Sequence, residues 1–325
     1  MADYKILLAT HPFGDAGGKP LEILQKTGWE LVRNPFQRRL KAGEVGALIR
    51  ECDAVIAGTE PYDADTLKSA SRLKLISRVG IGLDNVNLRY CKERGIKVAY
   101  TPEAPSDAVA ELTVANILNL LRHVSTSDRS VRENAWNRLM GVLVREVKIG
   151  IFGMGRIGSR VAKLLQPFTP AILANDSDPA VHGKEFPGVT WTSPERLLKE
   201  ADLVTLHIPM NDSNRMFINR AKIATMKTGA MLINTSRGDI LEEEALGDAL
   251  LQGHLAGAAL DVYAREPYEG PLTKMDNVIL TAHIGASARL SRYNMELEAA
   301  ENCVAILQNK TIKHDAIKDT FKESP

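Results

Sequence analysis

The segment KIGIFGMGRIGSRVAKLLQPF, residues 148–168, decides the fold that we predict for this chain. An apolar strand leads into the glycine pattern GMGRIG and then into a helix that carries Val161, Leu164 and Leu165 on one face. This order of strand, turn and helix is typical of the phosphate-binding corner of a dinucleotide-binding domain. The glycine pattern alone also arises by chance, so the surrounding sequence has to support it.

Each glycine of the pattern has its own physical reason. Gly153 allows the tight turn after the strand, Gly155 lets the backbone approach a pyrophosphate, and Gly158 permits close packing of helix and strand. The next strand, AILAN, ends at Asp176, where a carboxylate can accept hydrogen bonds from both hydroxyls of an adenosine ribose. The segment NDSDP has no arginine for a 2′-phosphate, so we predict NAD rather than NADP. The alternative is a structural glycine turn with Asp176 as a solvated loop acid.

Two alternations of strands and helices predict an α/β protein with two domains. The first alternation runs from Tyr4 to Tyr100, and the second begins at Lys148. The helical segments 107–125 and 289–308 are long enough to connect two domains. We therefore predict one domain from residues 1–107 and 290–325, into which a nucleotide-binding domain of residues 108–289 is inserted.

Composition narrows the class of protein and of partner. The chain has 325 residues, 44% hydrophobic and 25% charged, with a formal net charge of +1. This balance favours neither nucleic acid nor acidic membranes as partners. The scattered Cys52, Cys91 and Cys303 predict buried, reduced thiols. The first residues, MADYKILLAT, look like a strand rather than a targeting segment, so we expect a cytoplasmic protein.

Three further motifs each follow a predicted strand of the second alternation. They are INTSRGDI with Arg237, ALDVYAREP with Glu266, and LTAHIGAS with His283. Taken singly, these residues are commonly a surface arginine, a solvated glutamate and a strand-capping histidine. Together they supply a guanidinium for a carboxylate, an acid–base group, and a carboxylate that favours the charged imidazole. Reduction of a 2-keto acid by hydride transfer requires this set.

These motifs resemble the D-isomer-specific 2-hydroxyacid dehydrogenases, in family order and near family spacing. The resemblance rests on GMGRIG, LHIP, NTSRGDILEEEAL, ALDVYAREP and HIGAS, and it covers nearly the whole chain. It implies a flavodoxin-like substrate domain built from both chain ends and a Rossmann NAD-binding domain between them. It also implies a homodimer formed through the NAD domain, and a reaction that needs no metal.

The resemblance assigns roles to individual residues. Arg237 would hold the substrate carboxylate and polarise its C2 oxygen, His283 would exchange the proton at that oxygen, and Glu266 would pair with His283 and favour its charged form. Asp261 would lie at the nicotinamide amide. The other implied cofactor contacts, besides the three glycines, are Arg156, Ile157, Asp176, Ile208, Pro209, Thr235 and Gly285.

The segment SRVGIGLDNV, residues 77–86, resembles the family's substrate loop. Its backbone amides at Val79, Gly80 and Ile81 would bind the substrate carboxylate beside Arg237. Arg78 and Arg138 stand where the phosphoglycerate dehydrogenases of the family hold phosphate. We therefore predict 3-phosphoglycerate and phosphohydroxypyruvate as the substrate pair.

Two departures from the phosphoglycerate enzymes keep other substrates open. Ala57 and Gly58 stand where those enzymes have a further arginine, and Glu103 could place a negative charge near an anionic substrate. Glycerate with hydroxypyruvate, or another unphosphorylated 2-hydroxy acid, is the alternative pair. A corepressor-like NAD-responsive binding protein is the alternative of another class. Because the sequence stops at Pro325, we expect no feedback through an appended regulatory domain.

Overall fold

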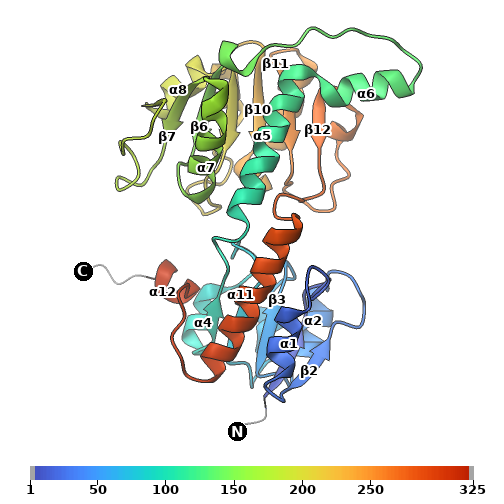
Figure 1. Cartoon of the computed structure of the whole chain (residues 1–325), viewed down its shortest axis with the longest axis vertical. Helices are drawn as coiled ribbons and strands as arrows, with labels where there is room; N and C mark the ends of the chain where they lie inside the picture. The colour runs from blue at the N-terminus through green and yellow to red at the C-terminus, as the bar shows by residue number, and fades with distance from the viewer. Residues whose placement is uncertain (1–3, 322–325) are drawn as a thin grey trace. The chain divides into compact units, whose positions relative to one another are not determined.

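The computed structural model describes residues 4–321, which form two compact α/β units. Unit 1 comprises the chain up to Pro105 together with the chain from Ala286 onward, and unit 2 comprises Ser106–Gly285. Figure 1 follows the chain by colour, so that both the blue N-terminal part and the red C-terminal part appear in unit 1.

Unit 1 has a sheet of five parallel strands in the order β2-β1-β3-β4-β5. This order is that of the flavodoxin-like fold, as predicted. The strands are short, and all of them lie within the predicted alternation from Tyr4 to Tyr100. They are β1 (Lys5–Leu8), β2 (Glu30–Arg33), β3 (Ala54–Ala57), β4 (Leu75–Arg78) and β5 (Lys97–Ala99).

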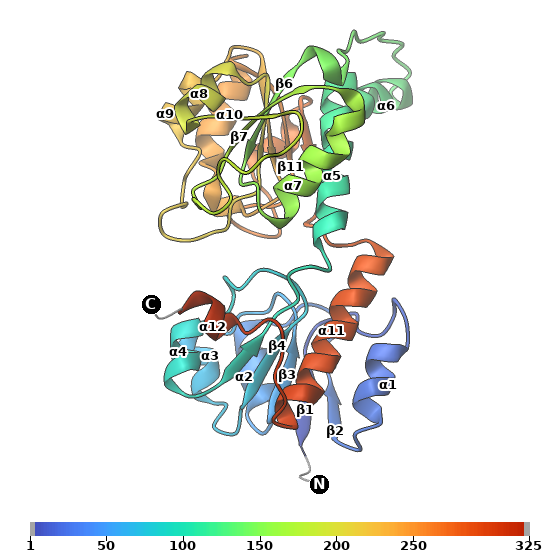
Figure 2. The same ribbon diagram turned by 60° about the vertical axis from the view of Figure 1, so that its left-hand side comes forward.

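Helices cover both faces of this sheet (Figure 2). On one face, α1 (Lys19–Gln25) and α11 (Arg289–Leu307) pack on strand residues such as Ile6, Ile56 and Leu75. The opposite face carries α2 (Ala42–Ile49), α3 (Ala64–Lys68), α4 (Leu88–Glu93) and α12 (Ala316–Thr320). Both faces bury apolar side chains, which explains why the inner strands β1 and β3 carry consecutive apolar residues, at 6–8 and 54–57, rather than an alternating pattern.

Unit 2 has a sheet of seven parallel strands in the order β12-β11-β10-β9-β6-β7-β8. Counted from β6, this is the Rossmann order with one added strand, as predicted. The strands are β6 (Lys148–Phe152), β7 (Ala171–Asn175), β8 (Val189–Trp191), β9 (Leu203–Leu206), β10 (Ala230–Asn234), β11 (Leu255–Leu260) and β12 (Val278–Leu280). We did not predict β8, because three residues at a sheet edge give no apolar run.

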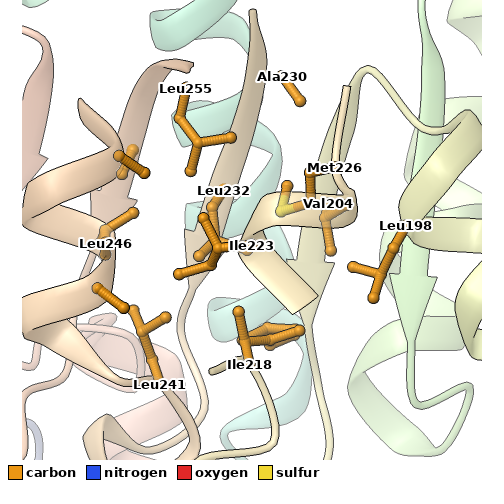
Figure 3. Close-up of a cluster of buried hydrophobic side chains, with 14 of the residues drawn as sticks. Leu198, Val204, Ile218, Ile223, Met226, Ala230, Leu232, Leu241, Leu246 and Leu255 are labelled. Atoms are coloured by element: carbon orange, nitrogen blue, oxygen red, sulfur yellow. The ribbon is translucent and has the colours of Figure 1, made fainter. Parts of the chain in front are cut away.

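Two helical layers enclose this second sheet. One contains α5 (Ser106–Arg122) and α7 (Arg156–Leu165). The other contains α8 (Pro194–Glu200), α9 (Arg220–Thr225) and α10 (Glu243–Leu251). Figure 3 shows the apolar side chains of this second layer, where Leu198, Ile223 and Leu246 face the strand residues Val204 and Leu232.

The packing of α7 corrects one detail of the predicted helix. Its buried residues are Gly158, Val161, Ala162 and Leu165, whereas Leu164 is 40% exposed. The buried positions follow the spacing i, i+3, i+4 and i+7, which is one stripe of an α-helix. Leu164 lies beside that stripe rather than on it.

Several short elements complete the described chain. Helix α6 (Val124–Arg132) has no buried residue, and four 3-10 segments lie at Val144–Glu146, Gln166–Phe168, Gly238–Ile240 and Pro271–Lys274. Cys52, Cys91 and Cys303 are free and buried, as predicted. Across residues 4–321, no helix combines the length and the apolar character needed to cross a membrane.

Candidate functional site

The glycine corner of unit 2 lies between β6 and α7, as the sequence predicts. Gly153 has a φ of +87°, and a Cβ there would lie 2.5 Å from the carbonyl oxygen of His207. A Cβ on Gly158 would lie 1.9 Å from the carbonyl oxygen of Gly153. Gly155 differs, because a Cβ there would meet no atom within 4 Å. Gly153 and Gly158 are therefore required by the protein's own packing, whereas Gly155 faces open space.

Asp176 follows β7 and faces the glycine loop. Its Oδ2 accepts a hydrogen bond from Met154 N–H at 2.7 Å, and its Oδ1 accepts one from Asp178 N–H at 2.9 Å. Each carboxylate oxygen can accept a further hydrogen bond. The corner thus combines a helix N-terminus, an uncovered glycine and a partly buried carboxylate. This donor and acceptor set fits a dinucleotide, with amides for its pyrophosphate and the carboxylate for its ribose.

The other predicted cofactor contacts occur at the same edge of the sheet. Arg156 and Ile157 begin α7, and Ile208 and Pro209 follow β9. Thr235 follows β10, is buried, and has its hydroxyl 3.0 Å from the hydroxyl of Thr113 on α5. All lie at the carboxyl ends of strands, where open α/β sheets bind their ligands.

His283 and Glu266 lie side by side, and their side chains are only partly exposed, at 39% and 29%. Nδ1 of His283 lies 2.9 Å from Oε2 of Glu266 and 3.1 Å from Oε1. Glu266 is held in turn by the N–H of Tyr263, which donates to its Oε1 at 3.2 Å. Because Nδ1 faces the carboxylate, Nε2 is the ring nitrogen left to face a ligand.

Asp261 fixes the turn that carries His283. The side chain, 1% exposed, accepts hydrogen bonds from the N–H groups of Ile284 and Gly285, each at 2.8 Å, and from the hydroxyl of Thr281 at 2.6 Å. Its backbone carbonyl accepts the N–H of His283 at 2.9 Å. His283 has a φ of +52°, in the left-handed region that a non-glycine residue rarely adopts. Asp261 therefore orients His283, a role that we did not predict from the sequence.

Arg237 is tied to the loop that carries Glu266, because the next residue, Gly238, packs against that loop. Arg237 follows β10, and its Nη1 donates to the carbonyl of Ser236 at 2.6 Å. Gly238 packs so closely on the next loop that a Cβ there would lie 1.9 Å from the carbonyl carbon of Tyr263. Strands β10, β11 and β12 are neighbours in the sheet. The structure thus brings the loops that carry Arg237, Glu266 and His283 to one edge of unit 2.

Glu243 is a second residue that the sequence reasoning missed. It begins α10, and its Oε1 accepts the N–H of Ala264 at 2.7 Å, which ties the loop that carries Glu266 to that helix. Burial raises the pKa of the Glu243 carboxyl above its usual range, while the hydrogen bond from Ala264 opposes the rise. In the sequence, the acidic run LEEEAL is what could point to this role of Glu243, but the run does not indicate which of its glutamates turns inward.

His207, in the motif LHIP, is a partly buried histidine beside the glycine corner, and its ring nitrogen Nδ1 is enclosed. Its Nε2 lies 3.1 Å from the hydroxyl of Thr205, and its Nδ1 has no hydrogen-bond partner among the described residues. Burial lowers the pKa of His207 to about 3. The imidazole is therefore neutral at physiological pH.

The predicted substrate loop of unit 1 uses two of its three amides internally. Val79 N–H donates to the carbonyl of Ala57 at 2.8 Å, so a substrate carboxylate would have to replace that carbonyl, and the predicted contact stays a prediction. Gly80 N–H donates to the hydroxyl of Thr101 at 2.8 Å, so a carboxylate would have to replace that hydroxyl. Ile81 lies next along the chain and is partly exposed. The sequence pattern could not show these internal acceptors.

The two predicted phosphate ligands differ in environment. Arg78 is 6% exposed, and its Nη1 donates to the carbonyl of Val79. Arg138 lies exposed in unit 2, in the segment after α6. The described residues contain no cluster of three or more histidine, cysteine or acidic side chains suited to a metal ion.

Comparison with known proteins identifies the family to which the chain belongs. Residues 114–285 match the family model described as the D-isomer specific 2-hydroxyacid dehydrogenase NAD-binding domain. The chain is 36% identical over 287 residues to a glyoxylate reductase of Thermofilum pendens, with 85% of each chain covered. It is 37% identical over 290 residues to a hydroxypyruvate reductase of Thermotoga maritima, covering 86% of this chain and 94% of the relative.

Two further similarities extend this picture. A D-3-phosphoglycerate dehydrogenase of Synechocystis is 34% identical over 88% of this chain, which spans only 53% of that longer protein. The crystal structure of the TT0316 protein from Thermus thermophilus has a TM-score of 0.86 and 34% identity, with 96% of this chain and 99% of that chain covered. The chain belongs to the D-isomer specific 2-hydroxyacid dehydrogenase family and is an NAD-dependent enzyme that acts on CH–OH donors.

Proposed function

We propose that this enzyme reduces a small, unphosphorylated 2-oxo acid, either a 2-keto acid such as hydroxypyruvate to its D-2-hydroxy acid, or glyoxylate to the achiral glycolate. The observation that carries the chemistry is the pair of His283 and Glu266, whose facing atoms lie 2.9 Å apart beside the loop of Arg237. A proton donor and a guanidinium at one sheet edge are what reduction of a carbonyl next to a carboxylate requires.

His283 supplies the proton in this proposal. Its Nε2 gives a proton to the C2 oxygen while hydride reaches C2, so that the carbonyl becomes an alcohol, which is secondary for a 2-keto acid and primary for glyoxylate. Glu266, held at Nδ1, stabilises the protonated ring before transfer and fixes its orientation afterward. In the reverse direction the same Nε2 removes the hydroxyl proton.

Arg237 binds the substrate carboxylate, because a guanidinium offers two parallel N–H donors to two oxygens. NADH, when bound, supplies the hydride. The amides at the start of α7 would hold its pyrophosphate, Asp176 its adenosine ribose, and Ile208 and Thr235 would line the site. Within the described residues, Gly285 N–H is the one hydrogen-bond donor to Oδ2 of Asp261, so this oxygen can also accept from a carboxamide.

The surroundings of Arg78 and Gly58 favour an unphosphorylated substrate. Arg78 is almost completely buried and donates to the neighbouring carbonyl of Val79. Gly58 cannot be replaced by arginine without movement, because a Cβ there would lie 2.8 Å from both Glu60 Oε1 and Thr10 Oγ1. The similarity to hydroxypyruvate and glyoxylate reductases points to the same substrate class.

Phosphohydroxypyruvate is the second candidate substrate. Arg78 and Arg138 are the specific residues that favour it, and the similarity to a D-3-phosphoglycerate dehydrogenase supports it. Because Arg78 lies in a buried environment, we rank this candidate below the unphosphorylated acids.

A panel of 2-keto acids with NADH, followed by the absorbance of the nicotinamide, tests the proposed function. We expect turnover of hydroxypyruvate or glyoxylate, and chiral chromatography should identify the hydroxypyruvate product as the D-enantiomer. Tight binding of NADH without turnover of any acid would instead favour a corepressor-like binding protein.

We also propose that two copies of the chain associate through unit 2. Apolar side chains are exposed on α6 and the segment after it, among them Trp136 at 77% and Met140 at 92%. Exposed apolar surface of this extent favours a protein partner, and a second copy fits a family enzyme. Sedimentation equilibrium should give a dimer, and Met140→Glu combined with Trp136→Glu should give a monomer. A monomeric unmodified protein would refute the proposal.

A further inference from the structure

A buried polar cluster lies at the carboxyl edge of the unit 1 sheet. In the order β2-β1-β3-β4-β5, the direction of winding reverses between β1 and β3. The loops after these two strands carry Thr10 and Glu60, and Arg78 ends the adjacent strand β4. Open parallel sheets bind ligands at this reversal point. The cluster is therefore placed where unit 1 would meet a substrate.

Two opposite charges are buried in this cluster. Glu60 is 2% exposed and Arg78 is 6% exposed. The Oε2 atom of Glu60 accepts the N–H of Gly58 at 2.7 Å and lies 3.5 Å from the hydroxyl of Tyr62. Asn85 secures the loop by donating to the carbonyls of Gly58 and Glu60, at 3.1 Å and 2.6 Å. A carboxylate held so firmly in a buried place acts on its surroundings with little screening by solvent.

Hydrogen bonds connect the surroundings of the two charges. Arg78 donates to the carbonyl of Val79, whose own N–H donates to the carbonyl of Ala57 at 2.8 Å, and the N–H of the next residue, Gly58, donates to Glu60. Glu60 in turn lies beside the hydroxyl of Tyr62. Burial raises the pKa of the Tyr62 hydroxyl well above 10, the charge of Glu60 raises it further, and the charge of Arg78 lowers it. The pairing of the strands also places the two residues close together. Ala57 of β3 lies opposite Arg78 of β4, and Glu60 follows Ala57 by three residues. The carboxylate and the guanidinium thus belong to one electrostatic group.

We propose that Glu60 is a specificity-determining residue, which rests on the function proposed above. By offsetting the positive charge of Arg78, Glu60 disfavours 2-keto acids that carry a second negative charge, such as a phosphate at C3. The two buried charges sum to zero, so a phosphate meets no net attraction there. The effect acts through space and needs no contact between Glu60 and the substrate.

If Glu60 served only to hold the loop in shape, its replacement by glutamine would leave the preference between the two substrates unchanged. Glutamine at this position keeps an oxygen that accepts the N–H of Gly58, so the loop keeps its shape while the charge is lost. Similarly, Arg78→Gln keeps an amide donor and removes the positive charge. The net charge of Glu60 and Arg78 together is then zero in the unmodified enzyme, positive in E60Q, negative in R78Q and zero in the double variant.

The test measures kcat/KM for phosphohydroxypyruvate divided by kcat/KM for hydroxypyruvate, with NADH, in these four proteins. We expect the ratio to rise roughly 10-fold or more in E60Q and to fall by a similar factor in R78Q. In the double variant it should return near its starting value. A ratio that is the same in all four proteins overturns the proposal, even where absolute activities change.

The ratio is internal to each preparation, so partial misfolding cancels. If E60Q alone does not fold, the ratios of the other three proteins still test the proposal. We expect the ratio in R78Q to lie below the ratios in the double variant and in the unmodified enzyme. Glu51→Gln is the matched control, because its carboxylate is 75% exposed and its loss changes the net charge equally; its ratio should not move. No turnover of either acid by the unmodified enzyme would refute the proposed function rather than the role of Glu60.

Discussion

The two units place polar groups at the same kind of sheet edge but bury them differently. In unit 2, His283 and Glu266 are partly exposed and are fixed by backbone hydrogen bonds to Asp261 and Tyr263. In unit 1, Glu60 and Arg78 are almost completely buried. Exposed, oriented groups can exchange protons with a ligand, whereas buried charges act on it through their field. We infer that unit 2 carries the chemistry and unit 1 the discrimination between substrates.

His283→Ala gives the largest effect that this comparison predicts. Loss of the proton donor should lower kcat on the order of 10²- to 10⁴-fold, because general acid catalysis contributes about that much. NADH fluorescence titration should show unchanged cofactor binding. If unit 2 carries the chemistry and unit 1 the discrimination, the preference between phosphorylated and unphosphorylated acids should stay the same in His283→Ala. In E60Q, by contrast, that preference should change.

Glycine substitutions separate packing from cofactor approach within unit 2. Gly158→Ala places a Cβ 1.9 Å from the carbonyl oxygen of Gly153 and should lower the stability by several kcal/mol, on the order of other overpacked or strained sites. Gly155→Ala meets no protein atom within 4 Å and should leave the melting temperature unchanged while weakening NADH binding. Equal loss of stability in both variants would contradict the open space at Gly155.

Stability should depend on pH through His207. The pKa is about 3 in the folded state against 6.5 ordinarily, so below 6.5 the unfolded chain binds a proton that the folded chain does not. The folded state is thus destabilised as the pH falls, by about 2 kcal/mol between about pH 7 and pH 5. Urea unfolding at both pH values should show this loss. His207→Gln should reduce it, and an identical pH dependence in the variant would count against the partly buried, neutral imidazole.

The smallest effect is expected for cofactor choice. Asp176→Asn keeps an acceptor for Met154 N–H but removes the charge that faces a 2′-phosphate. The preference for NADH over NADPH in kcat/KM should fall roughly 10-fold. Similar kcat/KM values for NADH and NADPH in the unmodified enzyme would show that Asp176 does not select the cofactor.

The sequence predicts the fold well because its signals are local. Apolar runs that end at loops such as GMGRIG mark the strands, and their number and spacing give both sheets. The edge strand β8 escapes prediction because Val189–Trp191 is too short to form a pattern. The sequence predicts Leu164 on the buried face of α7, but Leu164 lies beside that face. Adjacent residues of a helix point about 100° apart, so Leu164 and Leu165 do not lie on the same stripe.

The residues of the candidate site stand in motifs that the sequence reveals, whereas the contacts that hold these residues in place are not visible in the sequence. Arg237, Glu266 and His283 follow strands within motifs, which the sequence reveals. The role of Asp261 in holding the turn of His283, and that of Glu243 in holding Ala264, depend on contacts between distant segments. The internal acceptors of Val79 and Gly80, and the burial of Arg78, arise in the same way. No local pattern encodes them.

The most direct measurement is the kcat/KM of the unmodified enzyme for hydroxypyruvate against that for phosphohydroxypyruvate, with NADH at saturation. The neutral pair of Glu60 and Arg78 predicts that hydroxypyruvate is the better substrate. A clear preference for phosphohydroxypyruvate would contradict this, because it would mean that Arg78 attracts phosphate despite the carboxylate buried beside the same tyrosine.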